Sequence, residues 1–280
     1  MLIETTTCQA VQVRFGSQAG GGSRTITVVD TPGFNDTTRP DGEILAEISE
    51  FLAAQRGSNV PLRGILFLHK ITENKITGSD ETYLSLLESL VGEAAMSNLI
   101  LVTTMWNKMR DEDKGEGMQR EQDLIDNYWE PLIAKGAYVA QFDGTRKSAL
   151  SFVSHLSGKQ GVVLKIQKEV WDEERAIIGT SAGRRLWQQL TKKRAKMQDR
   201  LSDVDKQMGE GQTGLQSERD KVGGVLSRIA QSFTRMSERP GPGLKKRMAD
   251  MLAGDGATAQ GIRVLITIFN IALFVASAAA

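Results

Sequence analysis

An acid and a glycine end an apolar strand pattern near the start of the chain. Residues 25–29 are β-branched and predict a buried strand, which Asp30, Pro32 and Gly33 follow in a turn. An Asp at the carboxyl edge of a parallel strand can hold Mg²⁺ through water, and the N–H of a nearby glycine can face a terminal phosphate. Asp30 and Gly33 are therefore candidates for a metal and phosphate site, although Pro32 and Gly33 also suit a plain type II turn.

Further short motifs follow this one in an order that resembles a known family. They are Asp30-Thr31-Pro32-Gly33-Phe34, then Asn107-Lys108 after the apolar run 99–104, and then Ser148-Ala149. The first resembles the Asp-x-x-Gly switch motif of P-loop GTPases, and its Phe34 resembles the septin-like and AIG-type branch, particularly the fungal G-domain proteins. The resemblance covers approximately residues 5–156 and implies a G domain that binds GTP or GDP with Mg²⁺.

The resemblance also implies roles for individual residues. In such domains, Asp30 and a threonine before the first strand lie at the Mg²⁺ ion. Thr7 is the best candidate by position, with Thr5 and Thr6 as alternatives, and a solvated threonine run is the competing interpretation. The residues implied in nucleotide binding are Asp30, Gly33, Thr104, Asn107, Lys108, Ser148 and Ala149. No residue is implied as catalytic.

The position that selects the base departs from the family pattern. Guanine selectivity rests on an Asp whose two oxygens accept from the ring N–H and the exocyclic amine. Aligning residues 104–107 with the Thr-x-x-Asp form puts Asn107 at that position, and the register that begins at Asn107 ends at Arg110. The amide of Asn107 has only one acceptor oxygen, and Arg110 is not an acid. Neither register therefore supplies the carboxylate that selects guanine.

Two further departures concern the phosphates. The loop Gly-x-x-x-x-Gly-Lys-Ser/Thr, which cradles the phosphates in P-loop GTPases, does not occur in the 280 residues. In the resembled fold this loop follows a central strand, between the strands 25–29 and 64–69, so we expect a sheet that lacks this strand. We prefer N-terminal truncation of a longer GTPase over a degenerate domain completed by a partner. Phe34 also replaces the Gln that orients the attacking water. We expect GTP hydrolysis only in a full-length parent, and even there another group, such as one supplied across a dimer, would have to orient the water.

Hydrophobic periodicity predicts the elements that must position these residues. We expect strands at 11–15, 25–29, 64–69, 99–104 and 137–142. The first two form an antiparallel hairpin around the glycine-rich residues 16–23, and the continuous apolar runs suit a parallel sheet. Helices are expected from 41, with Asp41 as N-cap, from 79 to Gly92, from 116 to 135 with a kink at Pro131, and from 145. The expected fold class is α/β: a P-loop GTPase-like, mostly parallel sheet lacking its first strand, followed by an α-helical coiled-coil region.

From residue 161 the composition changes to long charged helix. Apolar residues at heptad spacing run from Leu190 to Met208 and from Leu215 to Met236, with a glycine-rich turn at 209–214 between them. An antiparallel helical hairpin and an oligomeric coiled coil both satisfy this pattern.

The chain ends in an uncharged apolar stretch, residues 264–280, behind basic residues at 245–247 and Arg263. This stretch lies at the short end of the lengths that span a bilayer. Its sequence allows two interpretations: a C-terminal tail anchor, or a helix packed onto the coiled-coil region. We divide the chain into an incomplete G domain at 1–158, a helical region at 159–239, a hinge and short basic helix at 240–263, and the apolar tail at 264–280.

Composition limits the other functions. A net charge of +1 gives no reason to expect nucleic acid as a partner, and one cysteine and two separate histidines make neither a disulfide framework nor a metal cluster. We expect a cytoplasmic protein, tail-anchored to an intracellular membrane if the tail inserts. The expected function is GTP binding of the septin-like and AIG-type class, weak or inactive as written, with homo-oligomers through the switch region or the coiled coil. The alternative is a membrane-tethered coiled-coil scaffold that carries a degenerate GTPase domain.

Overall fold

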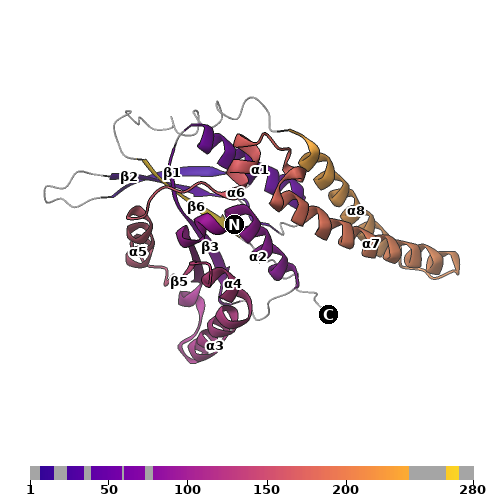
Figure 1. Cartoon of the computed structure of the whole chain (residues 1–280). Helices are drawn as coiled ribbons and strands as arrows, with labels where there is room; N and C mark the ends of the chain where they lie inside the picture. Colours follow the sequence, from indigo (N-terminus) through magenta and orange to yellow (C-terminus); the bar gives the residue numbers. More distant parts are fainter. Residues whose placement is uncertain are drawn as a thin grey trace.

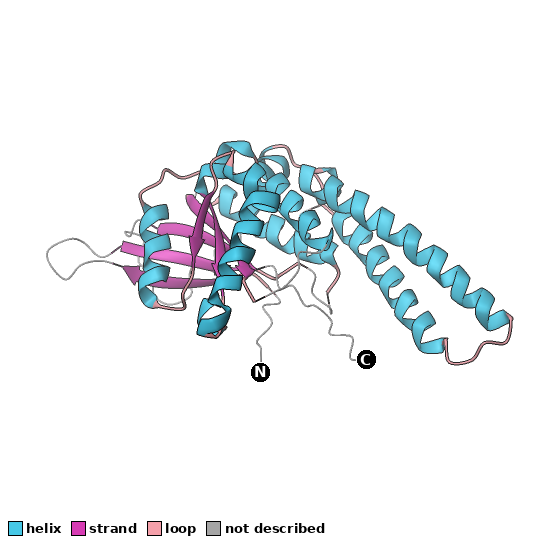
Figure 2. Cartoon of the chain, turned by 90° about the horizontal axis from the view of Figure 1, so that it is seen from below, coloured by secondary structure: helices cyan, strands magenta, loops and turns pink. Residues whose placement is uncertain are grey.

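The computed structural model describes residues 7–15, 24–34, 39–58, 60–72, 78–239 and 263–270. In this part of the chain helices cover both faces of one sheet, and a long pair of helices extends away from it (Figures 1 and 2). Several expectations concern residues outside those described. They are Thr5, Thr6, the loop at 16–23, the hinge and short helix at 240–262, and the last residues of the tail, 271–280.

The sheet has six strands in the order β1-β2-β6-β3-β4-β5. They are β1 (Gln9–Phe15), β2 (Arg24–Asp30), β3 (Leu62–Lys70), β4 (Leu99–Thr104), β5 (Tyr138–Gln141) and β6 (Arg263–Asn270). β1 is antiparallel to β2, and every other neighbouring pair is parallel. The α/β class, the mostly parallel sheet and the five strands predicted from periodicity are therefore confirmed.

The central strand position that we expected to be vacant is filled by the C-terminal segment. β6 lies between β2 and β3, parallel to both, and pairs Ile266 with Val28 and Ile268 with Leu66. The expectation of a sheet lacking its central strand is therefore wrong. The same finding places 264–270, which we assigned to the apolar tail, in the sheet. A continuous apolar run suits a strand buried on both faces as well as a membrane span, and only its pairing partners distinguish the two.

Among the described residues, no helix has the length and apolarity that crossing a membrane requires.

α1 (Asp41–Gly57) and α2 (Gly78–Val91) cover one face of the sheet. The apolar stripes expected on these helices are buried: Ile44, Leu45, Ile48, Phe51 and Leu52 on α1, and Tyr83, Leu86, Leu87 and Leu90 on α2. The N-cap of α1 is Pro40 rather than Asp41, and no side chain caps this end. Asp41 instead lies in the first turn, where a carboxylate interacts favourably with the helix dipole.

The segment expected as one kinked helix at 116–135 consists of three pieces. α3 (Lys114–Leu124) continues through a π-helical turn, η4 (Ile125–Trp129), into α4 (Glu130–Ile133). Pro131 lacks an N–H, so the regular hydrogen-bond ladder cannot continue through this region. The π-helical turn carries Trp129, which is fully buried with its ring edge-on to Phe67 and His69.

α5 (Arg146–Ser157) covers the opposite face of the sheet. Its Phe152 and Leu156 pack in a second, smaller core with Ile26, Leu66 and Ile100. Figure 1 shows α5 on the side of the sheet away from α1 and α2. Shorter elements connect the layers: the 3₁₀ turns Glu93–Asn98, Trp106–Lys108, Asp111–Asp113 and Ile177–Gly179, α6 (Lys165–Gln167) and a π-helical turn at Lys168–Asp172.

The helical region forms a hairpin within the chain. α7 (Ser181–Gly209) and α8 (Gln216–Ser237) run antiparallel, and an ion pair of 2.7 Å joins Arg219 to Asp205 (Figure 2). At the base of the hairpin α7 packs against α2 and α8 packs against α1. Val204, Val222 and Ile229 of the heptad pattern are buried. Of the two arrangements that the sequence allowed, the structure contains the hairpin, and an oligomeric coiled coil stays a prediction.

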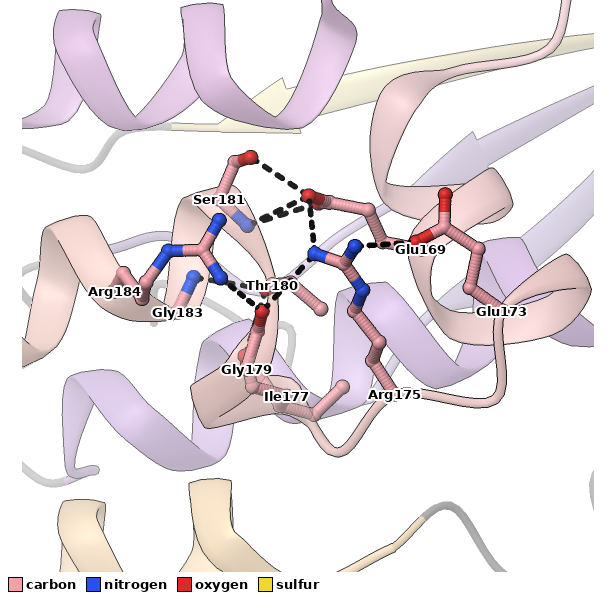
Figure 3. A network of polar contacts seen from close by, with 9 residues as sticks. All are labelled: Glu169, Glu173, Arg175, Ile177, Gly179, Thr180, Ser181, Gly183 and Arg184. Carbon is pink, nitrogen blue, oxygen red and sulfur yellow. Dashed lines mark hydrogen bonds and ion pairs between the residues drawn. The ribbon is translucent and has the colours of Figure 1, made fainter.

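A polar network fixes the residue at which α7 begins (Figure 3). The buried carboxylate of Glu169 accepts hydrogen bonds from the Ser181 N–H at 2.9 Å and the Ser181 hydroxyl at 2.7 Å, and it pairs with Arg175. The Thr180 hydroxyl caps the helix by accepting from the Gly183 N–H at 2.9 Å. These bonds connect the first turn of the hairpin to the π-helical turn that packs against α1.

Candidate functional site

The candidate residues gather at one edge of the sheet. β2, β6, β3, β4 and β5 are parallel, so their carboxyl ends meet at that edge. Asp30 ends β2, Asn107 closely follows β4, and Ser148 closely follows β5. Three strand spacings separate β2 from β4, which is about 14 Å at the usual spacing. Ligands of open parallel sheets bind outside this edge, so Asp30 and Asn107 mark two ends of one candidate site.

At the β2 end, an aromatic contact anchors the turn. Phe34 is only 4% exposed, and its ring stacks on Tyr83 of α2 with 5.6 Å between the centroids. The Tyr83 hydroxyl donates to the Asp41 carboxylate at 3.4 Å. Asp30 and Gly33 are half-buried. The turn is therefore held against α2 while Gly33 keeps part of its surface open at the sheet edge.

Thr7 lies at the same end of the sheet. It is exposed just before β1, and the pairing of Gln9 with Asp30 places it beyond the carboxyl end of β2. No group of three or more His, Cys, Asp or Glu in the described ranges is arranged to hold a metal ion. Mg²⁺, however, is usually held by one or two carboxylates together with water and substrate phosphates. Asp30 and Thr7 fit a site of that kind.

At the β4 end, a chain of hydrogen bonds fixes the turn that carries Asn107. The Trp106 indole Nε1 donates to Thr103 Oγ1 at 2.9 Å, and the Thr103 hydroxyl donates to Glu121 of α3 at 2.6 Å. With Trp106 buried in this way, the following residues Asn107 and Lys108 are exposed.

Other predicted binding residues make bonds within the chain. Thr104 is buried, and its hydroxyl donates to the carbonyl of His69 at 3.2 Å. The Ser148 N–H donates to Thr145 Oγ1, and the Ala149 N–H donates to the Thr145 carbonyl, both at 3.2 Å. The backbone N–H groups that the resemblance assigns to the base thus form the first turn of α5.

The loop between β5 and α5 is organised by Asp143, which the motif analysis did not single out. Its carboxylate accepts from the Thr145 N–H at 2.8 Å, from the Thr145 hydroxyl at 2.7 Å and from the Ser148 hydroxyl. These donors, Ser148 first and Thr145 second, lower the pKa of Asp143 to about 2. The loop therefore presents a fixed negative charge beside the start of α5.

Gly144 brings the β4 and β5 loops together. Its φ is +87°, a conformation that favours glycine, and a Cβ there would lie 2.7 Å from Asn107 Nδ2. The Asn107 carboxamide therefore lies against the open face of Gly144. The Asp143-Gly144-Thr145 sequence is an Asx-type turn signal at a helix start, and it could have indicated this loop from the sequence.

A comparison with protein families adds to this geometry. Residues 4–127 match the AIG1 family. This match supports an AIG1 family domain, a G domain of the GTPase type, at these residues. The matched residues include Asp30, Gly33, Asn107 and Lys108, and the family implies binding of a guanine nucleotide. The Asp143 loop lies after the matched residues and follows β5, which pairs with β4 in the same sheet. A search of curated proteins gave no match.

Proposed function

We propose that this chain binds GTP or GDP along the carboxyl edge of its sheet, as a G domain of the septin-like and AIG-type class. The phosphates and Mg²⁺ would lie at Asp30, Gly33 and Thr7. The base would lie at Asn107 and Lys108, beside the loop at 143–148. The observation that supports the proposal is that these separate motifs lie at one sheet edge in a chain whose residues 4–127 match the AIG1 family.

We further propose that the binding is weak. The chain contains no Gly-x-x-x-x-Gly-Lys-Ser/Thr loop to surround the phosphates with backbone N–H groups. The strand at the centre of the sheet, β6, ends instead at Asn270. Without that loop and its lysine, the phosphate charge would be met mainly by Mg²⁺ and Gly33.

Hydrolysis by this chain is not part of the proposal. A G domain that hydrolyses GTP needs a group that orients the attacking water. Phe34 holds the position after Gly33, has no polar atom in its side chain, and is packed on Tyr83. No other described residue has geometry that assigns it this role.

Binding of a fluorescent GTP analogue in the presence of Mg²⁺ tests the proposal. We expect saturable binding that is weakened at least tenfold by Asp30→Ala and that an ATP analogue competes for poorly. The Asp30→Ala variant should keep the circular dichroism spectrum of the parent chain. An absence of saturable binding at any accessible concentration would refute nucleotide binding by this chain.

A second candidate function is an interaction scaffold that uses a G domain with no bound nucleotide, tethered to a membrane by the C-terminal tail. The tether requires residues 264–270 to leave the position of β6 in the sheet. The helical hairpin favours it, because α7 and α8 extend well beyond the sheet (Figure 2). Flotation of the full chain with lipid vesicles, together with its oligomeric state in solution, tests this function. A monomer that stays with the soluble fraction would argue against it.

A further inference from the structure

A polar pocket of about 600 Å³ lies between α2 and α7, which pack against each other (Figure 1). The described residues that line it come from these two helices and from Asp41 at the start of α1. None of them belongs to the proposed nucleotide site. The volume is within the range of sites that bind small ligands. Leu186 and Leu190, which also line the pocket, are buried, so α7 is fixed in place beside it.

The α7 wall of this pocket carries a row of basic side chains. Arg185, Lys192 and Lys196 follow one another at intervals of seven and four residues, so they lie along one face of the helix, with Lys193 beside them. The three lysines are exposed, and none of them makes an ion pair within the described part of the chain. Like charges one helical turn apart repel each other, and an anion bound over them would relieve this repulsion.

Arg185 is held in position at one end of this row. Its Nε donates to the Ser85 Oγ of α2 at 3.1 Å, and the Ser85 hydroxyl donates to the Thr82 carbonyl at 2.8 Å. The two terminal amino groups of the guanidinium have no partner among the residues that the structure describes. A planar guanidinium with free terminal N–H groups matches two oxygens of one phosphate or carboxylate.

Two acids on the other side of the pocket determine where an anion can lie. Asp41 accepts from the Tyr83 hydroxyl at 3.4 Å, and Glu81 is exposed near the start of α2. Four basic and two acidic side chains line the described pocket, which gives it a formal charge of +2. All of the basic side chains are on α7, so an anion would bind against that helix.

The spacing of the basic groups indicates more than one anionic group in the ligand. Arg185 and Lys192 are seven residues apart, which is about 10 Å along a helix axis and too far for one anionic group to contact both backbone positions closely. Each lysine offers three donors, and a phosphate group supplies three acceptor oxygens where a carboxylate supplies two. A ligand with several phosphates therefore suits this wall better than one with a single carboxylate.

We propose that the pocket between α2 and α7 binds a compact ligand with at least two phosphate groups, one on Arg185 and the others on Lys192, Lys193 and Lys196. A free polyphosphorylated molecule and the headgroup of a polyphosphorylated lipid share this chemistry. The inference does not depend on nucleotide binding at the sheet edge.

Isothermal titration calorimetry of the full chain with inorganic tripolyphosphate, without Mg²⁺, tests the pocket. We expect one saturable site that the double variant Lys192→Gln/Lys196→Gln weakens at least about tenfold, because each lost lysine removes a charged hydrogen bond. The matched control is Lys206→Gln/Lys221→Gln, which removes the same charge from exposed lysines that do not line the pocket. It should change the affinity less than about twofold, since exposed charges at a distance are screened. Arg185→Lys keeps the charge but loses the planar fork, so it should also weaken binding.

Two further probes distinguish the sources of the ligand. They are inositol trisphosphate in the calorimeter and flotation with vesicles that contain phosphatidylinositol bisphosphate. Binding of the free probe without flotation assigns the pocket to a free polyphosphorylated molecule. Flotation that is lost in Lys192→Gln/Lys196→Gln but kept in the control assigns it to a lipid headgroup.

Several outcomes would overturn the inference. They are the absence of saturable binding of all these probes, and equal losses in the lysine double variant and its control. Tighter binding of a polyglutamate peptide than of tripolyphosphate would make a carboxylate-rich chain the ligand instead. Loss of tripolyphosphate binding in Asp30→Ala, with no effect of Lys192→Gln/Lys196→Gln, would assign the binding to the sheet edge. Failure of the GTP analogue to bind would refute the proposed function and leave this inference standing.

Discussion

At the scale of single residues, the start of α7 depends on the absence of one side chain. A Cβ at Gly183 would lie 1.8 Å from the Ile177 carbonyl oxygen, and the Gly183 N–H is bonded to the cap residue Thr180. We expect Gly183→Ala to lower the free energy of unfolding by about 3 kcal/mol, because the backbone must move to accept the methyl group. Urea unfolding followed by circular dichroism measures this change.

Gly223→Ala in α8 is the matched control for that variant. Nothing lies within 4 Å of the position that a Cβ would take at Gly223. Replacing a helical glycine by alanine where the methyl group has open space usually stabilises a protein by roughly 0.5–1 kcal/mol. Two variants with similar free energies of unfolding would contradict the close approach at Gly183.

His69 should make the stability depend on pH. Its ring is buried and lies 6.1 Å from the Trp129 ring, and burial, with a smaller contribution from Lys70, lowers its pKa from 6.5 to about 4. The unfolded chain therefore takes up this proton at a higher pH than the folded chain. Stability should be lost as the pH falls from about 6.5 to about 4, with a slope approaching 1.4 kcal/mol per pH unit.

The His69→Gln variant isolates this titration from the other groups that ionise in the same range. Its free energy of unfolding, measured by urea titration at several pH values, should fall less steeply between pH 6.5 and 4 than that of the parent chain. Parallel pH curves for the two chains would show that the pKa of His69 is not lowered.

The sequence indicated much of the candidate site but not how its residues are used. Asp30, Gly33, Asn107 and Lys108 could be found because their types and order are distinctive, and the structure places them at one sheet edge. The internal bonds of Thr104 and Ala149 could not be found, since they depend on where a neighbouring strand or turn brings an acceptor.

At the scale of elements, α1 and α8 touch through a glycine. A Cβ at Gly42 would lie 2.6 Å from the Cα, Cβ and carbonyl oxygen of Ser232, and the Gly42 N–H donates to the Ser232 hydroxyl at 3.2 Å. We expect Gly42→Ala to separate the two helices and to destabilise the chain by about 2 kcal/mol. Limited proteolysis should then cut α8 earlier than in the parent chain.

Ser232→Ala serves as the comparison for that contact. It removes the hydroxyl but adds no atom, so it should cost only about 1 kcal/mol, the usual net value of one hydrogen bond. A Gly42→Ala chain as stable and as resistant to protease as the Ser232→Ala chain would rule out the tight packing of α1 on α8.

The sequence correctly predicted whether a segment is a helix or a strand wherever its apolar residues recur at a long and regular spacing. The stripes of α1 and α2 were predicted and are buried, because a surface helix must turn such a stripe toward the sheet. Details that depend on one backbone group were missed. The N-cap of α1 is Pro40 rather than Asp41. A π-helical turn, which periodicity does not encode, precedes Pro131, and Pro131 itself lies in the first turn of α4.

At the scale of the whole molecule, the largest difference from expectation is the place of the C-terminal segment. Its apolar, uncharged pattern is the same for a tail anchor and for a strand buried on both faces, and the choice depends on whether two strand edges are available. β2 and β3 supply these edges, more than 190 residues earlier in the chain. Contacts of such sequence separation leave no local signal.

The sheet is therefore predicted to depend on its last strand. β6 pairs with β2 on one side and β3 on the other, so a chain that ends at residue 262 would leave two central edges unpaired and an apolar gap between them. We expect that chain to aggregate, to bind an apolar dye and to unfold well below the full chain in a thermal scan. A chain that ends at residue 270 keeps β6 and should unfold within a few degrees of the full chain. If the two shortened chains unfold at the same temperature as each other, β6 does not complete the sheet, and the segment would again be available as the apolar tail that its sequence suggests.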